Sequence, residues 1–263
     1  MAEMTKTIAY IPENLAEGAK NWDVGTWRLT QPDCFTAYFW CHESQETYNA
    51  GVPGKYGKPP LKPEFAAAND AIIEKLGMGQ SHYDPNAECY PQGMPDAGHR
   101  HFVMSLASDR FILLQQGGSY QETRTIWMDG RDMPERELYE YSYHGDSIGH
   151  WEGNTLVIET RNITSDNTAI SPNLPKSTDF WVEERWTFQD DTTIDVEMTF
   201  MDEQRFTEPY TESFQFIRDP ERETRIQTVA CVGGEGQRYF RDAGTGELML
   251  TGPGGAPLQV AED

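Results

Sequence analysis

His144-Gly-Asp-Ser-Ile-Gly-His-Trp-Glu-Gly-Asn-Thr-Leu-Val-Ile-Glu-Thr160 is the stretch of sequence that decides the fold. Glu152-Gly153-Asn154 is typical of a turn, because glycine and asparagine adopt positive φ angles at low steric cost. The apolar run 156–158 then predicts a returning strand. We therefore expect a β-hairpin here. Its histidines and acidic residues make it a candidate wall of an active site or ligand pocket.

Short segments with the pattern of strands lie on both sides of this hairpin. They are separated by turn-like pairs such as Asp129-Gly130 and Asp190-Asp191 rather than by helices, which indicates an antiparallel meander. Nine strands tend to curl into a closed sheet, so we expect a mainly β protein whose antiparallel meander closes into a lipocalin-like (calycin-type) barrel. The expected strands are 101–106, 110–116, 122–128, 155–160, 180–188, 192–201, 212–218, 224–232 and 237–241.

The segment 180–188 alternates between apolar and polar residues, and its apolar face carries one carboxylate, Glu184. A carboxylate in an apolar row either leans to the rim of the barrel, as a structural partner, or lies in a functional cavity. Both interpretations stay open. The segment 192–201 alternates in the same way, with one face made of Ile194, Val196, Met198 and Phe200.

The chain divides into three parts by pattern. Residues 1–95 are expected to form an irregular segment that packs on the barrel and contains one helix and a short strand at 36–41. The helix begins at Lys62-Pro63-Glu64, continues with apolar residues at helical spacing, and ends at Gly77. Residues 96–243 form the barrel domain, and the Gly- and Pro-rich residues 244–263 form a flexible tail.

Composition excludes several classes of function. The 263 residues include 21 basic and 43 acidic ones, giving a net charge of −22, which repels nucleic acids and anionic membrane surfaces. No apolar run is long enough to span a membrane, and the first residues lack the features of a signal peptide, so we expect a cytoplasmic protein. The cysteines show no metal-binding spacing and are expected to be free thiols: Cys34, Cys41, Cys89 and Cys231.

Several motifs occur in a specific order and spacing. They include Arg124-Thr-Ile-Trp-Met-Asp-Gly-Arg131, the stretch 147–160, Val182-Glu-Glu-Arg185 and Phe206-Thr-Glu-Pro-Tyr-Thr211. Over about residues 59–235 the chain resembles a large bacterial family, most of whose members have no assigned activity, with the motifs RRIYxDGR, SIGxWEGDTLVVDT, VxERF and YTxPWT. This chain departs from the family where it has Cys231-Val-Gly-Gly-Glu235 in place of a family histidine. His99-Arg100-His101 and Tyr143-His144 are also outside the family pattern, which points to chemistry specific to this member.

Candidate catalytic residues gather at the start of the hairpin. His144 and His150 titrate near neutral pH and suit general acid–base catalysis, Tyr143 could donate a hydrogen bond to a developing anion, and Asp146 could orient a histidine. Arg124 is the first candidate for a bidentate clamp on a substrate carboxylate. The other expected substrate-binding residues are His101, Glu184, Tyr141, Glu159 and Trp151.

These residues predict an enzyme without a cofactor, because no nucleotide-binding or nucleophile motif occurs. We expect a lyase, of decarboxylase, dehydratase or isomerase type, acting on a small aromatic or hydrophobic carboxylic acid. One alternative is a non-catalytic calycin-like binding protein. Another is a metal-dependent enzyme that uses His99 and His101 on one face of a strand, with Glu122 or Glu159 as a third ligand. A small-molecule substrate is the expected partner, and a homodimer is compatible with this interpretation.

Overall fold

The computed structural model describes residues 26–30, 60–67, 70, 91, 93–107, 109–116, 121–164, 176–219, 238–241 and 248–251. The expected strands 36–41 and 224–232, most of the expected tail and all four cysteines lie outside these ranges. Residues 63–67 and Asp70 are helical, which agrees with the predicted start of the helix. Within the described ranges, no helix is both long and apolar enough to cross a membrane.

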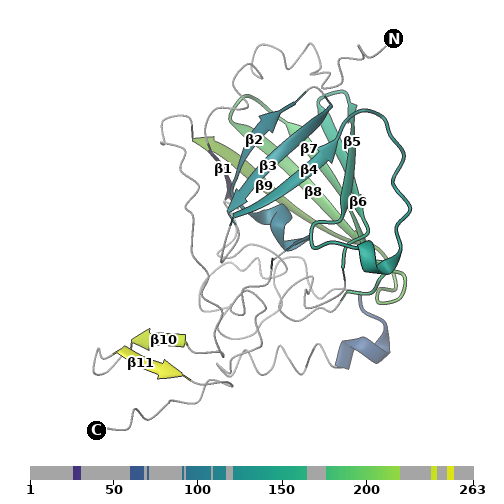
Figure 1. Ribbon diagram of the computed structural model, residues 1–263, viewed down its shortest axis with the longest axis vertical. Helices are drawn as coiled ribbons and strands as arrows, with labels where there is room; N and C mark the ends of the chain where they lie inside the picture. The colour runs from purple at the N-terminus through teal and green to yellow at the C-terminus, as the bar shows by residue number, and fades with distance from the viewer. Residues whose placement is uncertain are drawn as a thin grey trace.

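Nine strands close into one barrel in the order in which they occur along the chain (Figure 1). The first strand pairs antiparallel with both the second and the ninth, so the ring is complete. The predicted mainly β barrel is therefore confirmed. The strands are β1 (Thr26–Thr30), β2 (Phe102–Leu106), β3 (Arg110–Gln116), β4 (Gln121–Trp127), β5 (Asp146–Glu152), β6 (Thr155–Arg161), β7 (Trp181–Phe188), β8 (Thr193–Met201) and β9 (Tyr210–Asp219).

Two short helices and a two-stranded sheet are described outside the ring of strands. Two short 3-10 helices occur, η4 (Asp96–His99) and η5 (Leu138–Glu140). The strands β10 (Arg238–Arg241) and β11 (Leu248–Thr251) pair antiparallel as a separate sheet. β10 was predicted, whereas β11 falls in the stretch expected to be a flexible tail.

One pair of neighbours in the barrel, β4 and β5, is parallel. Strand direction can alternate all the way round a closed ring only when the number of strands is even. A ring of nine must contain at least one parallel pair, and here the other eight neighbouring pairs are antiparallel. The expectation of a purely antiparallel meander is therefore wrong at this seam.

The parallel seam requires a long connection, because the chain must return to the end of the barrel from which β4 began. Residues 128–145, which include η5, make this return along the outside of the barrel (Figure 1). The seam itself is short, with Ile126 opposite Ser147 and Trp127 opposite Ile148. Among the described strands, residues 121–125 of β4 therefore have no partner on the β5 side.

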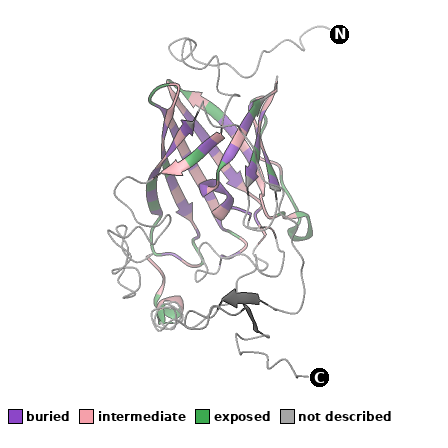
Figure 2. Ribbon diagram, turned by 90° about the vertical axis from the view of Figure 1, so that its left-hand side faces the viewer, coloured by how far each residue is buried: buried purple, intermediate pink, exposed green. Residues whose placement is uncertain are grey.

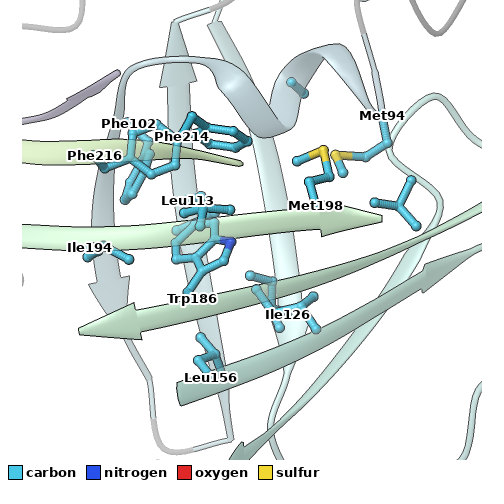
Figure 3. Close-up of a cluster of buried hydrophobic side chains, with 14 of the residues drawn as sticks. Met94, Phe102, Leu113, Ile126, Leu156, Trp186, Ile194, Met198, Phe214 and Phe216 are labelled. Atoms are coloured by element: carbon cyan, nitrogen blue, oxygen red, sulfur yellow. The ribbon is translucent and has the colours of Figure 1, made fainter. Parts of the chain in front are cut away.

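Buried residues alternate with more exposed ones along the strands of the barrel (Figure 2). The buried side chains fill the middle of the barrel. Phe102, Trp186 and Phe216 form its centre, with ring centroids 4.9–5.6 Å apart. Figure 3 shows apolar residues from neighbouring strands packed around Trp186. Residues on the predicted inner faces of 180–188 and 192–201 are buried here, so both alternations are confirmed.

The helix η4 packs against the polar end of this core. Gln115 Nε2 donates a hydrogen bond to the Ala97 carbonyl over 2.5 Å. A Cβ atom at Gly98 would lie 2.4 Å from Met198 Cε and 3.1 Å from Glu184 Oε1, so a larger residue here would require the Met198 side chain to move. The close approach holds η4 against the inward side chains of β7 and β8.

Two glycines of the hairpin region give a matched test of the fold. Gly145 and Gly153 have φ angles of 65° and 64°, but a Cβ at Gly145 would lie 2.2 Å from the Arg161 carbonyl oxygen, whereas Gly153 has open space around it. We expect Gly153→Ala to lower the free energy of unfolding by about 1–2 kcal/mol, the cost of a left-handed backbone. Gly145→Ala should cost roughly 2 kcal/mol more through overpacking, measured by urea denaturation. Equal losses would contradict the tight packing of residue 145 on β6.

Candidate functional site

A pocket of about 610 Å³ opens beside the β4–β5 seam. It lies where the unpaired part of β4 faces the segment that leads into β5. Three of the predicted catalytic residues, Tyr143, His144 and Asp146, belong to its lining and come together here. The remaining lining residues are Pro91, Glu122, Thr123, Thr125, Trp127, Ser142, Gly145 and Ser147. We refer to this feature as the seam pocket.

His144 and Glu122 form the ionisable pair of the seam pocket. Their Nε2 and Oε2 atoms are 2.7 Å apart, and the side chains are 18% and 5% exposed. This contact is an ion pair rather than a hydrogen bond. The backbone N–H of Gly93 also donates to Glu122 Oε2, over 3.3 Å. This carboxylate is thus fixed on the inner side of the imidazole.

Asp146 has different partners from those expected. Arg136 donates to both of its carboxylate oxygens over 3.1 Å, and Asn162 Nδ2 donates to Oδ2 over 2.8 Å. Asp146 therefore fastens the returning connection to β5, and the prediction that it orients a histidine is wrong. Glu122 has that position instead. Tyr143, whose carbonyl accepts from the Met94 N–H over 2.7 Å, anchors the same segment from the other side.

A buried polar network lies directly behind the seam pocket. Arg124 Nη2 donates to Glu184 Oε2 over 2.5 Å and to Thr160 Oγ1 over 2.8 Å, and its Nε donates to Ser147 Oγ over 3.2 Å. The two hydroxyls are 2.9 Å apart. All four side chains are buried. The guanidinium that was predicted to clamp a substrate carboxylate thus binds Glu184, and neither residue lines the seam pocket.

The other predicted residues lie away from the seam pocket. His150, 64% exposed, is 3.3 Å from Glu152, and Glu159 accepts from Arg161 on the outside of the barrel. Trp151 packs on the core beside Phe188, and the side chain of His101 is exposed. Tyr141 is half-buried just before the lining segment. None of these residues lines the seam pocket.

The histidine pair proposed for a metal does not share a strand face. His99 is the last residue of η4 and is buried, with Nε2 3.2 Å from Glu212 Oε2 and Nδ1 3.3 Å from the Pro95 carbonyl. His101 is exposed and precedes β2. The expected geometry is therefore wrong, because 99–101 is not part of the strand. The described residues contain no cluster of three potential metal ligands.

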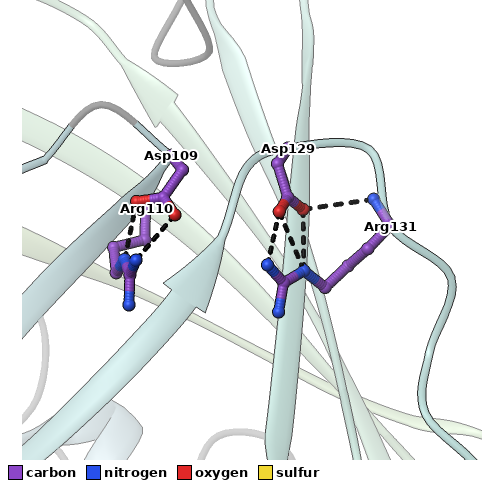
Figure 4. Close-up of polar contacts among 4 residues, drawn as sticks. All are labelled: Asp109, Arg110, Asp129 and Arg131. Carbon is purple, nitrogen blue, oxygen red and sulfur yellow. Dashed lines mark hydrogen bonds and ion pairs between the residues drawn. The ribbon is translucent and has the colours of Figure 1, made fainter. Parts of the chain in front are cut away.

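Trp127 supplies an aromatic wall of the seam pocket and is flanked by two guanidinium groups. Arg110 and Arg131 lie 3.9 and 3.5 Å from its ring centroid. Each guanidinium also binds a neighbouring carboxylate, Asp109 or Asp129 (Figure 4), and these hydrogen bonds lower the pKa of both carboxylates. The arrangement holds the indole in place and balances the charge around it.

Glu122, the carboxylate that contacts His144, was predicted from the sequence only as one of two alternative third ligands of a metal. It lies on β4 two positions before Arg124, so strict alternation puts both side chains on the inner face. That signal was present in the sequence. Its contact with His144 depends on the parallel seam, which the local pattern does not contain.

Lys176 is a buried amine close to η4. Its Nζ donates to the Met94 carbonyl over 2.8 Å, and the residue is 3% exposed. Burial lowers the pKa of Lys176 from its usual 10.5 to about 7, and the Asp96 carboxylate only partly opposes this shift. The amine therefore changes charge near neutral pH.

No protein-family model, curated protein or solved structure significantly matches this chain. The resemblance to the bacterial family with SIGxWEGDTLVVDT motifs therefore stays a prediction. The function must be argued from the seam pocket itself.

Arg124 and Glu184, the buried ion pair behind the seam pocket, predict that a single substitution destabilises the fold more than a double substitution does. Arg124→Met leaves Glu184 buried without a counter-charge and should lower the free energy of unfolding by about 3–5 kcal/mol. The double variant Arg124→Met/Glu184→Met should recover a large part of this loss, because no unpaired charge is left behind. Urea denaturation measures both. A double variant that is less stable than Arg124→Met would show that the loss of stability does not come from the buried, unpaired carboxylate of Glu184.

Lys176 predicts a stability that depends on pH. Its pKa is lower in the folded state, so the unfolded chain binds more protons between about pH 7 and 10.5, and this group makes folding more favourable as pH rises. The stability of Lys176→Met relative to the unsubstituted protein should therefore fall by roughly 2 kcal/mol between pH 7 and 9. Urea denaturation at several pH values measures this difference.

Lys62 offers the matched control for Lys176, because it also donates to a backbone carbonyl, that of Glu203, over 2.7 Å, but at an exposed position. The difference between Lys62→Met and the unsubstituted protein should not change over the same pH range. A flat difference for Lys176→Met as well would show that the buried amine does not titrate there.

Proposed function

We propose that the chain is a cofactor-independent lyase, of decarboxylase, dehydratase or isomerase type, that acts by acid–base chemistry on a small aromatic or hydrophobic carboxylic acid in the seam pocket. The observation that carries this proposal is the contact of His144 Nε2 with the buried carboxylate of Glu122, at 2.7 Å, in the wall of a pocket. An imidazole backed by a fixed carboxylate is a common device for moving protons near neutral pH.

In this proposal His144 takes a proton from the substrate or delivers one to it. Glu122 stabilises the imidazolium form and fixes the ring, because the Gly93 N–H holds the carboxylate in place. Tyr143 lines the same pocket and is the remaining candidate for stabilising a developing anion. All three residues belong to segments that meet only because β4 and β5 are parallel.

The size and lining of the seam pocket support a small substrate with an aromatic or apolar body. A volume of about 610 Å³ lies within the usual range of small-molecule sites. Trp127, whose ring lies between two guanidinium groups, offers its aromatic edge, and Thr123 and Thr125 offer hydroxyls. The carboxylate of Asp146 is paired with the guanidinium of Arg136, so it leaves little unbalanced negative charge to repel an acidic substrate.

The alternative function is a non-catalytic binding protein of calycin type, and the experiment below must distinguish it from the lyase. Side chains fill the centre of the barrel, so a ligand of such a protein would also use the seam pocket. Binding without any chemical change in the ligand would favour that alternative.

Proton transfer can be detected before the natural substrate is known. We expect the purified protein in D₂O to incorporate deuterium into, or change the mass of, at least one member of a panel of phenylacrylic, phenylpyruvic and mandelic acids. His144→Gln should slow the reaction about 100-fold or more, the usual contribution of a general acid–base group. Mass spectrometry and ¹H NMR follow the exchange.

The chain offers a matched control in His150, which also contacts a glutamate, Glu152, but on the exposed side of β5. His150→Gln should leave the rate unchanged. Saturable binding with no exchange and no change in mass would contradict the lyase. Equal rates for His144→Gln and the unsubstituted protein would remove His144 from the reaction.

A further inference from the structure

Ser147 is the one side chain that belongs both to the lining of the seam pocket and to the buried network behind it. It is the second residue of β5, 2% exposed, and is in register with Ile126 of β4 at the seam. Its hydroxyl binds the buried Arg124, while the residue itself borders the space that a substrate would occupy.

The hydrogens of this network can be counted. Ser147 Oγ accepts from Arg124 Nε, and Thr160 Oγ1 accepts from Arg124 Nη2. The two hydroxyls also bond to each other over 2.9 Å, so one of them donates and the other accepts. Each hydroxyl has one hydrogen and two acceptor positions. The accepting hydroxyl has both positions filled, and its own hydrogen must point away from the network.

Burial decides which hydroxyl that is. Thr160 is 0% exposed, and among the described residues its side-chain hydrogen bonds are those to Arg124 and Ser147. If Ser147 donated to Thr160, the Thr160 hydrogen would be buried without an acceptor, which is costly. If Thr160 donates to Ser147, the free hydrogen belongs to Ser147 and can point into the seam pocket. The second arrangement leaves no hydroxyl hydrogen buried without an acceptor, although within the described ranges Arg124 Nη1 and Glu184 Oε1 have no hydrogen-bond partner in either arrangement.

We propose that the Ser147 hydroxyl donates a hydrogen bond to an acceptor oxygen of the substrate, either a carboxylate or a carbonyl oxygen, and so determines specificity for that group. Arg124, Thr160 and Glu184 are positioning residues that fix the direction of this donor. The effect on turnover rests on the function proposed for the seam pocket. The direction of the Ser147 hydroxyl rests on the hydrogen-bond network alone.

The positive charge of Arg124 then acts on the substrate indirectly. Its Nε–H polarises the Ser147 hydroxyl, and the low-dielectric surroundings strengthen a chain of hydrogen bonds of this kind. Glu184 neutralises the buried guanidinium, so the network presents a neutral donor rather than a cation to the pocket. Such a donor suits an oxygen whose negative charge grows during the reaction.

Neutron diffraction from crystals exchanged into D₂O tests the direction of the hydroxyl without any ligand. We expect the Thr160 deuterium to lie between the two oxygens and the Ser147 deuterium to point into the seam pocket. A Ser147 deuterium directed at Thr160 would overturn the proposal, whatever the reaction turns out to be.

Two variants test whether the Ser147 hydroxyl recognises the substrate, because both of them alter the Arg124 network but only one removes this hydroxyl. Ser147→Ala removes the proposed donor. Thr160→Val removes the two network bonds of Thr160, to Arg124 and to Ser147, but keeps the Ser147 hydroxyl. With an acid that the protein turns over, we expect Ser147→Ala to lower kcat/KM about 100-fold, as for loss of an oxyanion donor, and Thr160→Val to lower it much less. Equal losses would indicate a purely structural effect and overturn the proposal.

Binding of 3-phenylpropanoate, followed by ¹H NMR, gives a readout that does not depend on turnover. Ser147→Ala should weaken it at least tenfold, whereas Thr160→Val should bind nearly as the unsubstituted protein does. A serine-dependent affinity without turnover would reject the lyase and retain the donor. An affinity that is independent of Ser147, or no binding to the unsubstituted protein, would reject the donor for carboxylate oxygens.

Discussion

The parity of the strand count is the constraint on which the rest of this structure depends. Nine strands cannot close into a ring with every neighbour antiparallel, so one seam must be parallel. That seam needs the connection 128–145, and its short register leaves part of β4 without a partner among the described strands. The seam pocket occupies this place and brings Glu122 of β4 next to His144 of the connection.

The buried polar network beside the seam fixes the positions of its side chains but adds little to the stability of the fold. Removing the charges of Arg124 and Glu184 from water is expensive, and their mutual attraction repays this cost only with good geometry and further hydrogen bonds. Those bonds come from Ser147 and Thr160, which are cross-strand partners on β5 and β6. The network thus connects the hairpin to β4 and β7 and fixes the inner wall of the pocket.

Most of the barrel could be predicted from the sequence, because strands reveal themselves by local alternation. The inner face of β7, including the odd carboxylate Glu184, and that of β8 are correct for this reason. β1 was missed because the stretch 26–30, although it alternates, has only five residues and is far along the chain from the other strands of the barrel. The parallel seam was missed because the direction of pairing is not a local property. The predicted role for Asp146 failed for the same reason, since its partners Arg136 and Asn162 come from other segments of the chain.

The candidate site was predicted only in part. Tyr143 and His144 lie in the seam pocket, at the start of the hairpin where the sequence pointed. Glu122 and Ser147 acquire their importance from contacts across the seam. Local sequence therefore identified the reactive residue types, whereas topology decided which of them meet.

An odd ring also limits how such a barrel can change in evolution or design. Inserting or deleting a single strand would give an even ring, in which every neighbour could be antiparallel and the returning connection would lose its purpose. The architecture can therefore change size without losing its parallel seam only in steps of two strands, as when a whole hairpin is duplicated or removed. A relative with eight or ten strands would need to build its pocket in a different way.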